Sequence, residues 1–346
     1  MTESDEVERQ IEEILAEVHG YRRGRVFTTF AELGIADELN KSLCDLNTLA
    51  TRIDADTTAL RRFLDAAVEF SLVEIDEDDD VRLTELGWRL YSPSSPDSRA
   101  NTLRLEAAFF ERWSRLATAV NTGKRPPENR QQEDDPAWVP MFTRALFERS
   151  RKTARAVAEA LDALITELNE STVRVLDLGG GHGGYSIALA RRHPQVSATV
   201  FDLPAVIETT SAIVQASDVA DRVQAVPSDF HHDDIGSVWD IILLFGVLHG
   251  ETPDGAHKLL RTISSSLPGH GKLLIRRQGR SNSSSEPGER ELFDLHMLLS
   301  TEGGQVSRSS DTRALLAEHG FQLEKEIDIP APASGAIDVY SFEEGQ

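Results

Sequence analysis

The sequence predicts an α/β protein in which a mostly parallel sheet ends in an antiparallel hairpin and follows a mainly helical N-terminal domain. Three observations support this fold class. Apolar runs alternate with helical patterns from residue 173 onward, as expected for βαβ units. A run of glycines, 179–184, follows the first apolar run. From Val7 to about Val73, apolar residues instead recur three and four positions apart, which is the spacing of amphipathic helices.

The N-terminal part combines these helices with a short hairpin. Helices fit 46–50 and 57–70, and Asp56 is a suitable N-cap for the second. The segments 72–75 and 81–84 flank an acidic turn and predict two short strands. A hairpin after a helix pair is typical of a winged helix, a module that often serves for dimerisation.

The C-terminal part predicts a Rossmann-like, doubly wound sheet with helices on both faces. Its expected strands are 173–178, 197–202, 222–226, 239–245 and 271–275. Its expected helices are 184–192, 204–216, 254–266 and 310–319. The apolar segments 321–329 and 336–342 have no helix between them, so they predict a terminal antiparallel hairpin.

We therefore expect three parts. Residues 1–100 form a winged-helix-like dimerisation domain. Residues 101–170, helical at 102–120 and 140–168, form a linker and substrate-pocket helices. Residues 171–346 form the ligand-binding α/β domain.

Composition excludes several classes of protein. The 346 residues carry a formal net charge of −22, which repels phosphate backbones and argues against a nucleic-acid partner. No apolar run approaches the roughly 18 residues needed to span a bilayer, and the acidic start is unlike a signal peptide. Cys44 is the only cysteine, which favours a cytoplasmic location. The acidity fits a salt-adapted host or a merely acidic protein equally well.

The glycine run predicts a nucleotide-type site. Strand, glycine turn and helix follow one another at 173–192, and Gly179, Gly181 and Gly184 satisfy the pattern G-x-G-x-x-G. Glycines allow close approach of a ligand to the backbone, and a helix N-terminus presents free N–H groups. The pattern alone is weak. A P-loop is excluded because the Gly-Lys-Ser/Thr ending is missing.

Three features favour S-adenosylmethionine over a nicotinamide dinucleotide: Asp177, Asp229 and the terminal hairpin, whereas the acid at Asp202 serves both cofactors equally. Asp202 ends the second strand, about 20 residues past the loop, where an acid accepts the ribose hydroxyls. Asp177 lies just before the glycines, where a dinucleotide fold usually has an apolar residue. Asp229 is placed to accept from an adenine amino group, with Phe230 against the ring, and Phe245 lies near the adenine edge.

Several segments together resemble the bacterial branch of the class I S-adenosylmethionine-dependent O-methyltransferases, the caffeic-acid and acetylserotonin type with a winged-helix dimerisation domain. The resemblance covers nearly the whole chain, and the combination is specific although no single segment is. The matching segments are R-L-T-E-L-G (82–87), F-F-E-R-W-S-R-L (109–116), V-L-D-L-G-G-G-H-G-G-Y-S (175–186), F-D-L-P (201–204), S-D-F (228–230), V-L-H-G (247–250) and D-L-H-M-L-L (294–299).

The resemblance implies roles for individual residues. Gly179 and Gly181 would line the methionine moiety of the cofactor, and Asp202 with Leu203 the ribose. Asp229 and Phe230 would bracket the adenine. His249 would be the general base. A homodimer with interlocking N-terminal domains is also implied, in which one subunit contributes to the partner's pocket for a small, aromatic acceptor.

The surroundings of His249 depart from the family pattern. Gly250 and Glu251 follow it instead of Asp-Trp, and the positions expected to hold carboxylates that support the imidazole contain Arg277 and Val306. A cationic neighbour such as Arg277 would lower the pKa of His249. Glu251, Glu302 or Asp294 could supply the carboxylate instead.

On the acceptor side, the resemblance points to His296 and Met297, and aromatic and apolar residues predict a pocket for a flat ring. These are Phe109, Phe110, Trp113, Phe142 and Leu146. Segment 281–285 is expected to cover the site. No metal site is expected, because the adjacent side chains of 231–234 do not converge readily on one ion.

Two alternatives to O-methylation stay open: C- or N-methylation, or another tailoring reaction that uses S-adenosylmethionine, on the same fold, and a winged-helix regulator that senses S-adenosylmethionine. Against the regulator, Arg61-Arg62 is the only basic pair suited to a recognition helix.

Overall fold

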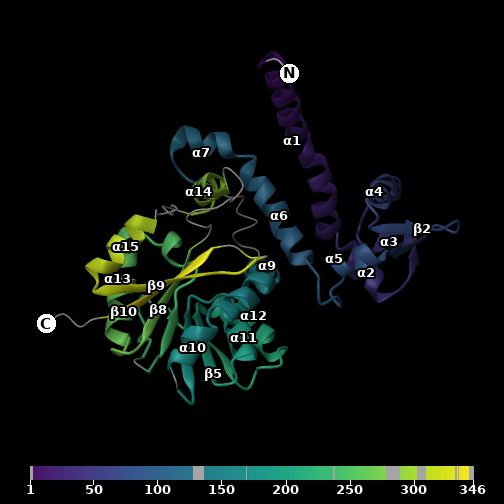
Figure 1. Cartoon of the computed structure of the whole chain (residues 1–346). Coiled ribbons are helices and arrows are strands. Elements are labelled where there is room, and N and C mark those ends of the chain that lie inside the picture. The colour runs from purple at the N-terminus through teal and green to yellow at the C-terminus, as the bar shows by residue number, and fades with distance from the viewer. Residues whose placement is uncertain are drawn as a thin grey trace. The chain divides into compact units, whose positions relative to one another are not determined.

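The computed structural model describes residues 3–127, 136–168, 170–236, 238–277, 289–301, 309–331, 333 and 335–342. The chain divides into two compact units, Met1–Glu111 and Arg112–Gln346, which are described separately (Figure 1). Within the described residues, none of the helices has both the length and the hydrophobicity needed to cross a bilayer.

The N-terminal unit is a helical domain with a small sheet. Its elements are α1 (Glu3–Glu32), α2 (Ile35–Lys41), β1 (Cys44–Asp45), α3 (Leu46–Arg52), α4 (Thr57–Glu69), β2 (Val73–Ile75), β3 (Asp80–Leu83), α5 (Glu85–Tyr91) and α6 (Ala100–Trp113), whose last two residues belong to the C-terminal unit. The predicted hairpin β2–β3 is confirmed. The predicted N-cap of α4 is also confirmed, because Asp56 Oδ1 accepts a hydrogen bond from the Ala59 N–H at 2.8 Å. The sequence did not predict β1, which pairs with β3.

The C-terminal unit holds the remaining elements. These are α7 (Leu116–Thr122), α9 (Trp138–Ala160), α10 (Asp162–Leu168), β4 (Val173–Leu178), α11 (Gly184–Arg192), β5 (Val196–Asp202), α12 (Pro204–Gln215), β6 (Val223–Pro227), β7 (Ile241–Leu243), a 3₁₀ turn η1 (Leu248–Gly250), α13 (Pro253–Ser266), β8 (Lys272–Arg277), α14 (Glu289–Ser300), α15 (Ser309–Glu318), β9 (Phe321–Asp328) and β10 (Ala336–Phe342). Two predicted helices are each split, at 114–115 and at Leu161.

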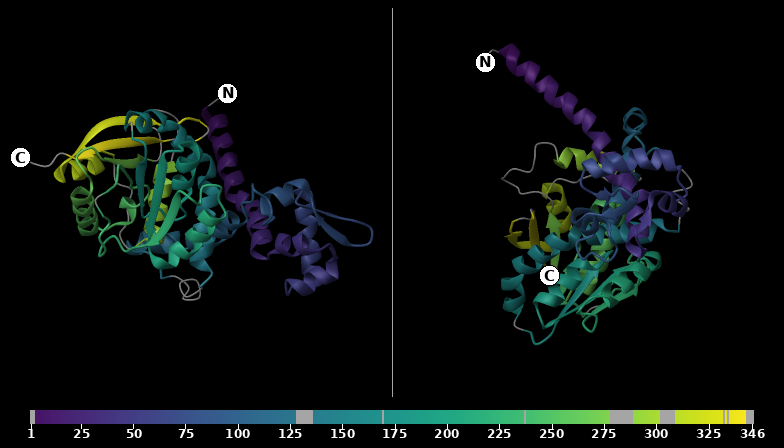
Figure 2. Two further views of the ribbon diagram at one scale, coloured as in Figure 1. Left: turned by 90° about the horizontal axis from the view of Figure 1, so that it is seen from below. Right: turned by 90° about the vertical axis from the view of Figure 1, so that its right-hand side faces the viewer.

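The described strands of this unit form a sheet in the order β6-β5-β4-β7-β8-β10-β9. Pairing from β6 to β8 is parallel, and β10 runs antiparallel to both β8 and β9. The predicted terminal hairpin is therefore confirmed, and its strands lie along one edge of the sheet (Figure 2).

Helices cover both faces of this sheet, as a doubly wound fold requires. One core cluster joins the sheet to α9, α10, α11 and α12, with Val157 and Leu189 at its centre. The other joins the opposite face to α13 and α15, with Leu260 and Leu316 fully buried. Parallel strands covered on both faces expose their carboxyl ends as the place for a ligand.

Candidate active site

The glycine loop leaves β4 in a conformation that side chains rarely adopt. Gly179, Gly181 and Gly183 have φ of 66°, 52° and 66°. A Cβ on Gly179 would lie 2.7 Å from Val247 Cγ2, so this glycine is required for close packing. A Cβ on Gly181 would meet only Asp202 Oδ2, at 4.0 Å. The backbone at Gly181 is therefore open to close approach by a ligand.

Asp202 holds the glycine loop against the end of β5. Its Oδ2 accepts from the Gly181 N–H at 2.8 Å, and its Oδ1 accepts from the Leu203 N–H at 2.8 Å. Burial raises the pKa of this carboxyl, while the two N–H donors oppose the rise. Leu203 is 51% exposed and follows the carboxylate directly.

Asp177 supports the loop from below. It is 1% exposed, and its Oδ2 accepts from the Ser186 hydroxyl at 2.8 Å. Burial, together with the charge of Asp202, raises the pKa of Asp177 to about 6. A Cβ on Gly180 would lie 2.5 Å from Asp177 Cγ. The structure thus places this carboxyl group within the protein, under the loop.

The end of β6 reaches the same loop. Phe230 Cε1 lies 3.5 Å from the position of a Cβ on Gly179. The carboxylate of Asp229 accepts from His232 Nδ1 at 2.7 Å and from the His231 N–H at 3.0 Å, and the His232 bond lowers its pKa. The neighbouring Ser228 Oγ is buried and makes no hydrogen bond within the described residues.

His249 lies in η1, beyond the end of β7. Its ring meets Phe293 of α14 edge-on, with the centroids 5.6 Å apart. Gly246, with φ of 78°, lets the chain turn here, and a Cβ on it would lie 3.5 Å from His249 Cε1. Burial lowers the pKa of His249. Across the described ranges, no hydrogen bond or ion pair involves its imidazole.

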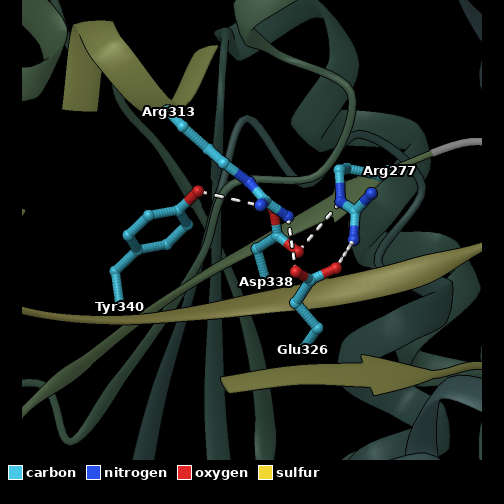
Figure 3. A network of polar contacts seen from close by, with 5 residues as sticks. All are labelled: Arg277, Arg313, Glu326, Asp338 and Tyr340. Carbon is cyan, nitrogen blue, oxygen red and sulfur yellow. Dashed lines mark hydrogen bonds and ion pairs between the residues drawn. The ribbon is translucent and has the colours of Figure 1, made fainter. Parts of the chain in front are cut away.

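Arg277 does not interact with His249. Its guanidinium pairs with Glu326, and its Nε donates to Asp338 Oδ1 at 2.9 Å (Figure 3). Arg313 of α15 pairs with the same two acids, and the Tyr340 hydroxyl donates to Asp338 Oδ2 at 3.4 Å. Asp338 is 2% exposed. This network fixes β9 and β10 to β8 and α15.

The expected influence of Arg277 on His249 is therefore corrected: burial lowers the pKa of the imidazole, and the charge of Arg277 is balanced elsewhere. Glu251 accepts from His231 Nε2 at 3.2 Å instead of supporting His249. Asp294 is exposed. Glu302, the remaining candidate carboxylate, and Val306 lie outside the described residues. Segment 281–285, which was expected to cover the site, also lies outside them.

A row of rings continues from His249 along α14. Phe293 stacks on His296 with centroids 6.4 Å apart, and Trp113 Nε1 donates to His296 Nδ1 at 3.3 Å. Met297 is 6% exposed. Burial lowers the pKa of His296, and the charges of Arg112 and Arg149 lower it further.

The α9 residues form a second aromatic group. Phe142 stacks on Trp138 at 6.0 Å, and the guanidinium carbon of Arg112 lies 4.9 Å from the Trp138 ring centroid. Leu146, one turn further along α9, is half-buried. Phe109 and Phe110 belong to the N-terminal unit, where Phe110 stacks on Tyr21 at 6.2 Å.

Sequence reasoning missed several residues around the loop. His182 is 8% exposed, and its Nδ1 accepts from the Gly184 N–H at 2.9 Å. Ser150 Oγ lies 2.7 Å from the position of a Cβ on Gly184. Tyr185 meets Phe245 edge-on at 5.2 Å. A histidine within a glycine run was a visible signal, whereas only tertiary packing reveals Ser150 and Tyr185.

Two family models match the chain: an O-methyltransferase domain over residues 115–322 and an O-methyltransferase dimerisation domain over residues 16–93. The O-methyltransferase SfmM3 of Streptomyces lavendulae is 28% identical over 325 residues, 89% of this chain and 93% of that protein. The 3-hydroxy-5-methyl-1-naphthoate 3-O-methyltransferase of Streptomyces sahachiroi is 27% identical over 323 residues, 92% of this chain and 91% of that protein.

The crystal structure of human N-acetylserotonin methyltransferase in complex with SAM has the same fold, with a TM-score of 0.77 and 23% identity over 99% of this chain and 100% of that one. The methyltransferase model spans more than half of the chain, and the glycine loop, Asp202 and Asp229 all fall within it. The chain belongs to the S-adenosylmethionine-dependent O-methyltransferase family.

Proposed function

We propose that this protein moves a methyl group from S-adenosylmethionine to a hydroxyl of a small aromatic acceptor at the carboxyl end of the C-terminal sheet. The observation that carries the proposal is the convergence of the glycine loop, Asp202 and Phe230 at the ends of β4, β5 and β6, with His249 beyond the next strand, β7. Donor site and candidate base thus share one edge of the sheet.

The residues present fit the cofactor. Gly181 is open to a ligand, and the buried Ser228 hydroxyl lacks a partner within the described residues. In the proposed arrangement, Gly179 and Gly181 line the methionine moiety and Asp202 with Leu203 binds the ribose. The adenine lies between Asp229 and Phe230, with Phe245 near its edge. Asp177 acts as a positioning residue, because its carboxyl group holds Ser186 beneath the loop.

The bound cofactor supplies a methyl group on a sulfonium, whose departure leaves a neutral thioether. The protein mainly has to align the acceptor oxygen with that methyl group, and such alignment can lower a barrier by several kcal/mol. His249 is neutral near pH 7 because burial lowers its pKa. It can therefore take the hydroxyl proton, but it is a weaker base than a carboxylate-supported imidazole. We infer that the enzyme prefers acceptors with an acidic hydroxyl.

An aromatic acceptor fits the rings on α14 and α9. We propose that His296 contacts a substrate oxygen through Nε2, in place of the Ser300 hydroxyl that lies 3.4 Å from it, because Nδ1 accepts from Trp113. Met297, Phe142 and Leu146 are proposed to supply apolar contacts. The naphthoate acceptor named for the Streptomyces sahachiroi relative has this character. The family model favours transfer to oxygen over transfer to carbon or nitrogen.

The dimerisation domain indicates a homodimer. The α1 helix carries large apolar side chains that are 44–60% exposed at helical spacing, and we propose that a second copy covers them. These are Val7, Ile11, Ile14, Leu15, Val18 and Tyr21. We further propose a cytoplasmic enzyme without a nucleic-acid partner, in keeping with the single Cys44 and the net charge of −22.

Calorimetry tests the cofactor site. S-adenosylhomocysteine should bind, and NAD should not. Methyl-labelled S-adenosylmethionine with a panel of naphthols and hydroxynaphthoates should then give labelled aryl ethers. Uptake of NAD without S-adenosylhomocysteine binding would overturn the proposal, and label on carbon or nitrogen would replace its O-methyl part.

A further inference from the structure

Arg276 is a half-buried cation without a counter-ion among the described residues. It is the penultimate residue of strand β8. Its buried Nε makes no hydrogen bond within the described residues. Those residues also provide no ion pair for its guanidinium, whereas the adjacent Arg277 pairs with two carboxylates. Because burying an unpaired charge is costly, such a group usually awaits a partner of opposite charge.

Arg276 lies at the carboxyl end of β8, which neighbours β7, the strand that leads to His249. Leu243 pairs with Leu274 in parallel register, so two residues further on Phe245 and Arg276 lie at the same level. The charge of Arg276 acts on Tyr185, whose ring meets Phe245 edge-on. The proposed cofactor cradle uses β4, β5 and β6. In the sheet, β7 and then β8 follow β4 on the side away from β5 and β6.

The acceptor side has positive character in an otherwise acidic protein. Arg112 and Arg149 both lower the pKa of His296. In a chain with a net charge of −22, the action of two arginines on His296 and the presence of Arg276 favour an anionic acceptor.

We propose that Arg276 binds the carboxylate of the acceptor, so that the preferred substrates are hydroxyaryl carboxylates. This inference rests on the proposed function and specifies its substrate class. The planar guanidinium offers paired N–H donors that match the two carboxylate oxygens. Such a contact fixes the ring, and fixing the ring directs the hydroxyl toward the methyl donor.

The test uses matched acceptors and the whole protein. The acids are 3-hydroxy-2-naphthoate and 6-hydroxy-2-naphthoate, and each is compared with its neutral amide and with 2-naphthol. The wild-type kcat/KM for at least one acid should exceed that for its amide by about tenfold or more, as expected for a charge-assisted hydrogen bond.

Arg276→Gln should remove this preference. It should lower kcat/KM for the acid by about tenfold or more and leave the amide within about twofold. Arg276→Lys should keep part of the preference, because lysine retains the positive charge but lacks the paired N–H donors of the guanidinium. Arg191→Gln is the matched control, because Arg191 pairs with Asp218 on the surface. This variant should leave kcat/KM unchanged for both the acid and the amide.

Each other result overturns the inference. Equal losses for acid and amide would make Arg276 structural. A fall in S-adenosylhomocysteine affinity in Arg276→Gln would assign the residue to the carboxylate of the cofactor instead. Methylation of 2-naphthol without any preference for acids would remove the inference and leave the proposed function standing. Absence of S-adenosylhomocysteine binding by the wild type would remove both.

Discussion

His249 is the residue whose role the structure defines most sharply, because its imidazole combines burial with the lack of a carboxylate partner in the described ranges. Burial favours the neutral form, so the basic imidazole persists to lower pH than usual. The cost is a weaker base, and the proposed mechanism therefore depends on the acidity of the acceptor hydroxyl.

His249→Ala should lower kcat by about a hundredfold for a phenol of pKa about 10, and by much less for a nitro-substituted phenol that ionises readily. In the wild type, kcat/KM should fall as pH drops through a value below 6.5, because burial lowers the folded pKa from 6.5. Steady-state rates at several pH values check both. Equal losses for both phenols would argue against His249 as the base.

His182 couples protonation to the glycine loop. Burial lowers its pKa from 6.5 to about 4, and its neutral Nδ1 accepts from the Gly184 N–H at the start of α11. The unfolded chain takes up this proton first. The free energy of unfolding should therefore fall between pH 6.5 and about 4, by up to about 3 kcal/mol. Asp177 acts in the opposite direction, because its folded pKa is raised to about 6.

His182→Asn separates the hydrogen bond of His182 from its titration. An asparagine oxygen can still accept from the Gly184 N–H, but it does not titrate. Relative to the wild type, this variant should gain stability as pH falls from 6.5 to about 4. Urea unfolding at intervals across that range measures the difference. A constant difference between variant and wild type would mean that His182 has the same pKa in the folded and the unfolded chain, which would contradict the effect of burial.

At the scale of elements, the antiparallel hairpin depends on a buried charge network. Asp338 on β10 is 2% exposed and binds Arg277, Arg313 and Tyr340. Asp338→Asn removes one partner of a buried pair and should cost about 3–5 kcal/mol of unfolding free energy. Asp218→Asn breaks the exposed pair with Arg191 and should cost less than about 1 kcal/mol. Comparable losses in the two variants would contradict the structural role of the network.

The elements themselves were largely predictable, whereas the contacts between them were not. Strand β4 and helix α11 begin and end where the sequence predicts, because hydrophobic periodicity and the glycine run are local signals. Strand β1 was missed because two residues show no period and the strand exists only by pairing with β3. The partners of Glu251 and Arg277 depend on tertiary packing, so no local pattern contains them.

At the scale of the whole molecule, the proposed homodimer depends on the exposed apolar side chains of α1. Ile14→Glu places a charge at the centre of this surface and should convert the dimer to monomers at micromolar concentration, because an unpaired charge resists burial. Ala16→Glu introduces the same residue on the opposite side of the helix and should leave the dimer intact. Sedimentation velocity distinguishes the two, and a dimeric Ile14→Glu variant would exclude this surface.

The order of strands also has a consequence for synthesis on the ribosome. Strand β10 lies between β8 and β9 in the sheet, although β9 precedes it in the chain. As translation proceeds from N- to C-terminus, β9 emerges before the only described strand with which it pairs. The edge of the nascent sheet at β8 stays open until β10 has been made, so chaperones that shield unpaired strands have their longest opportunity to act at that edge.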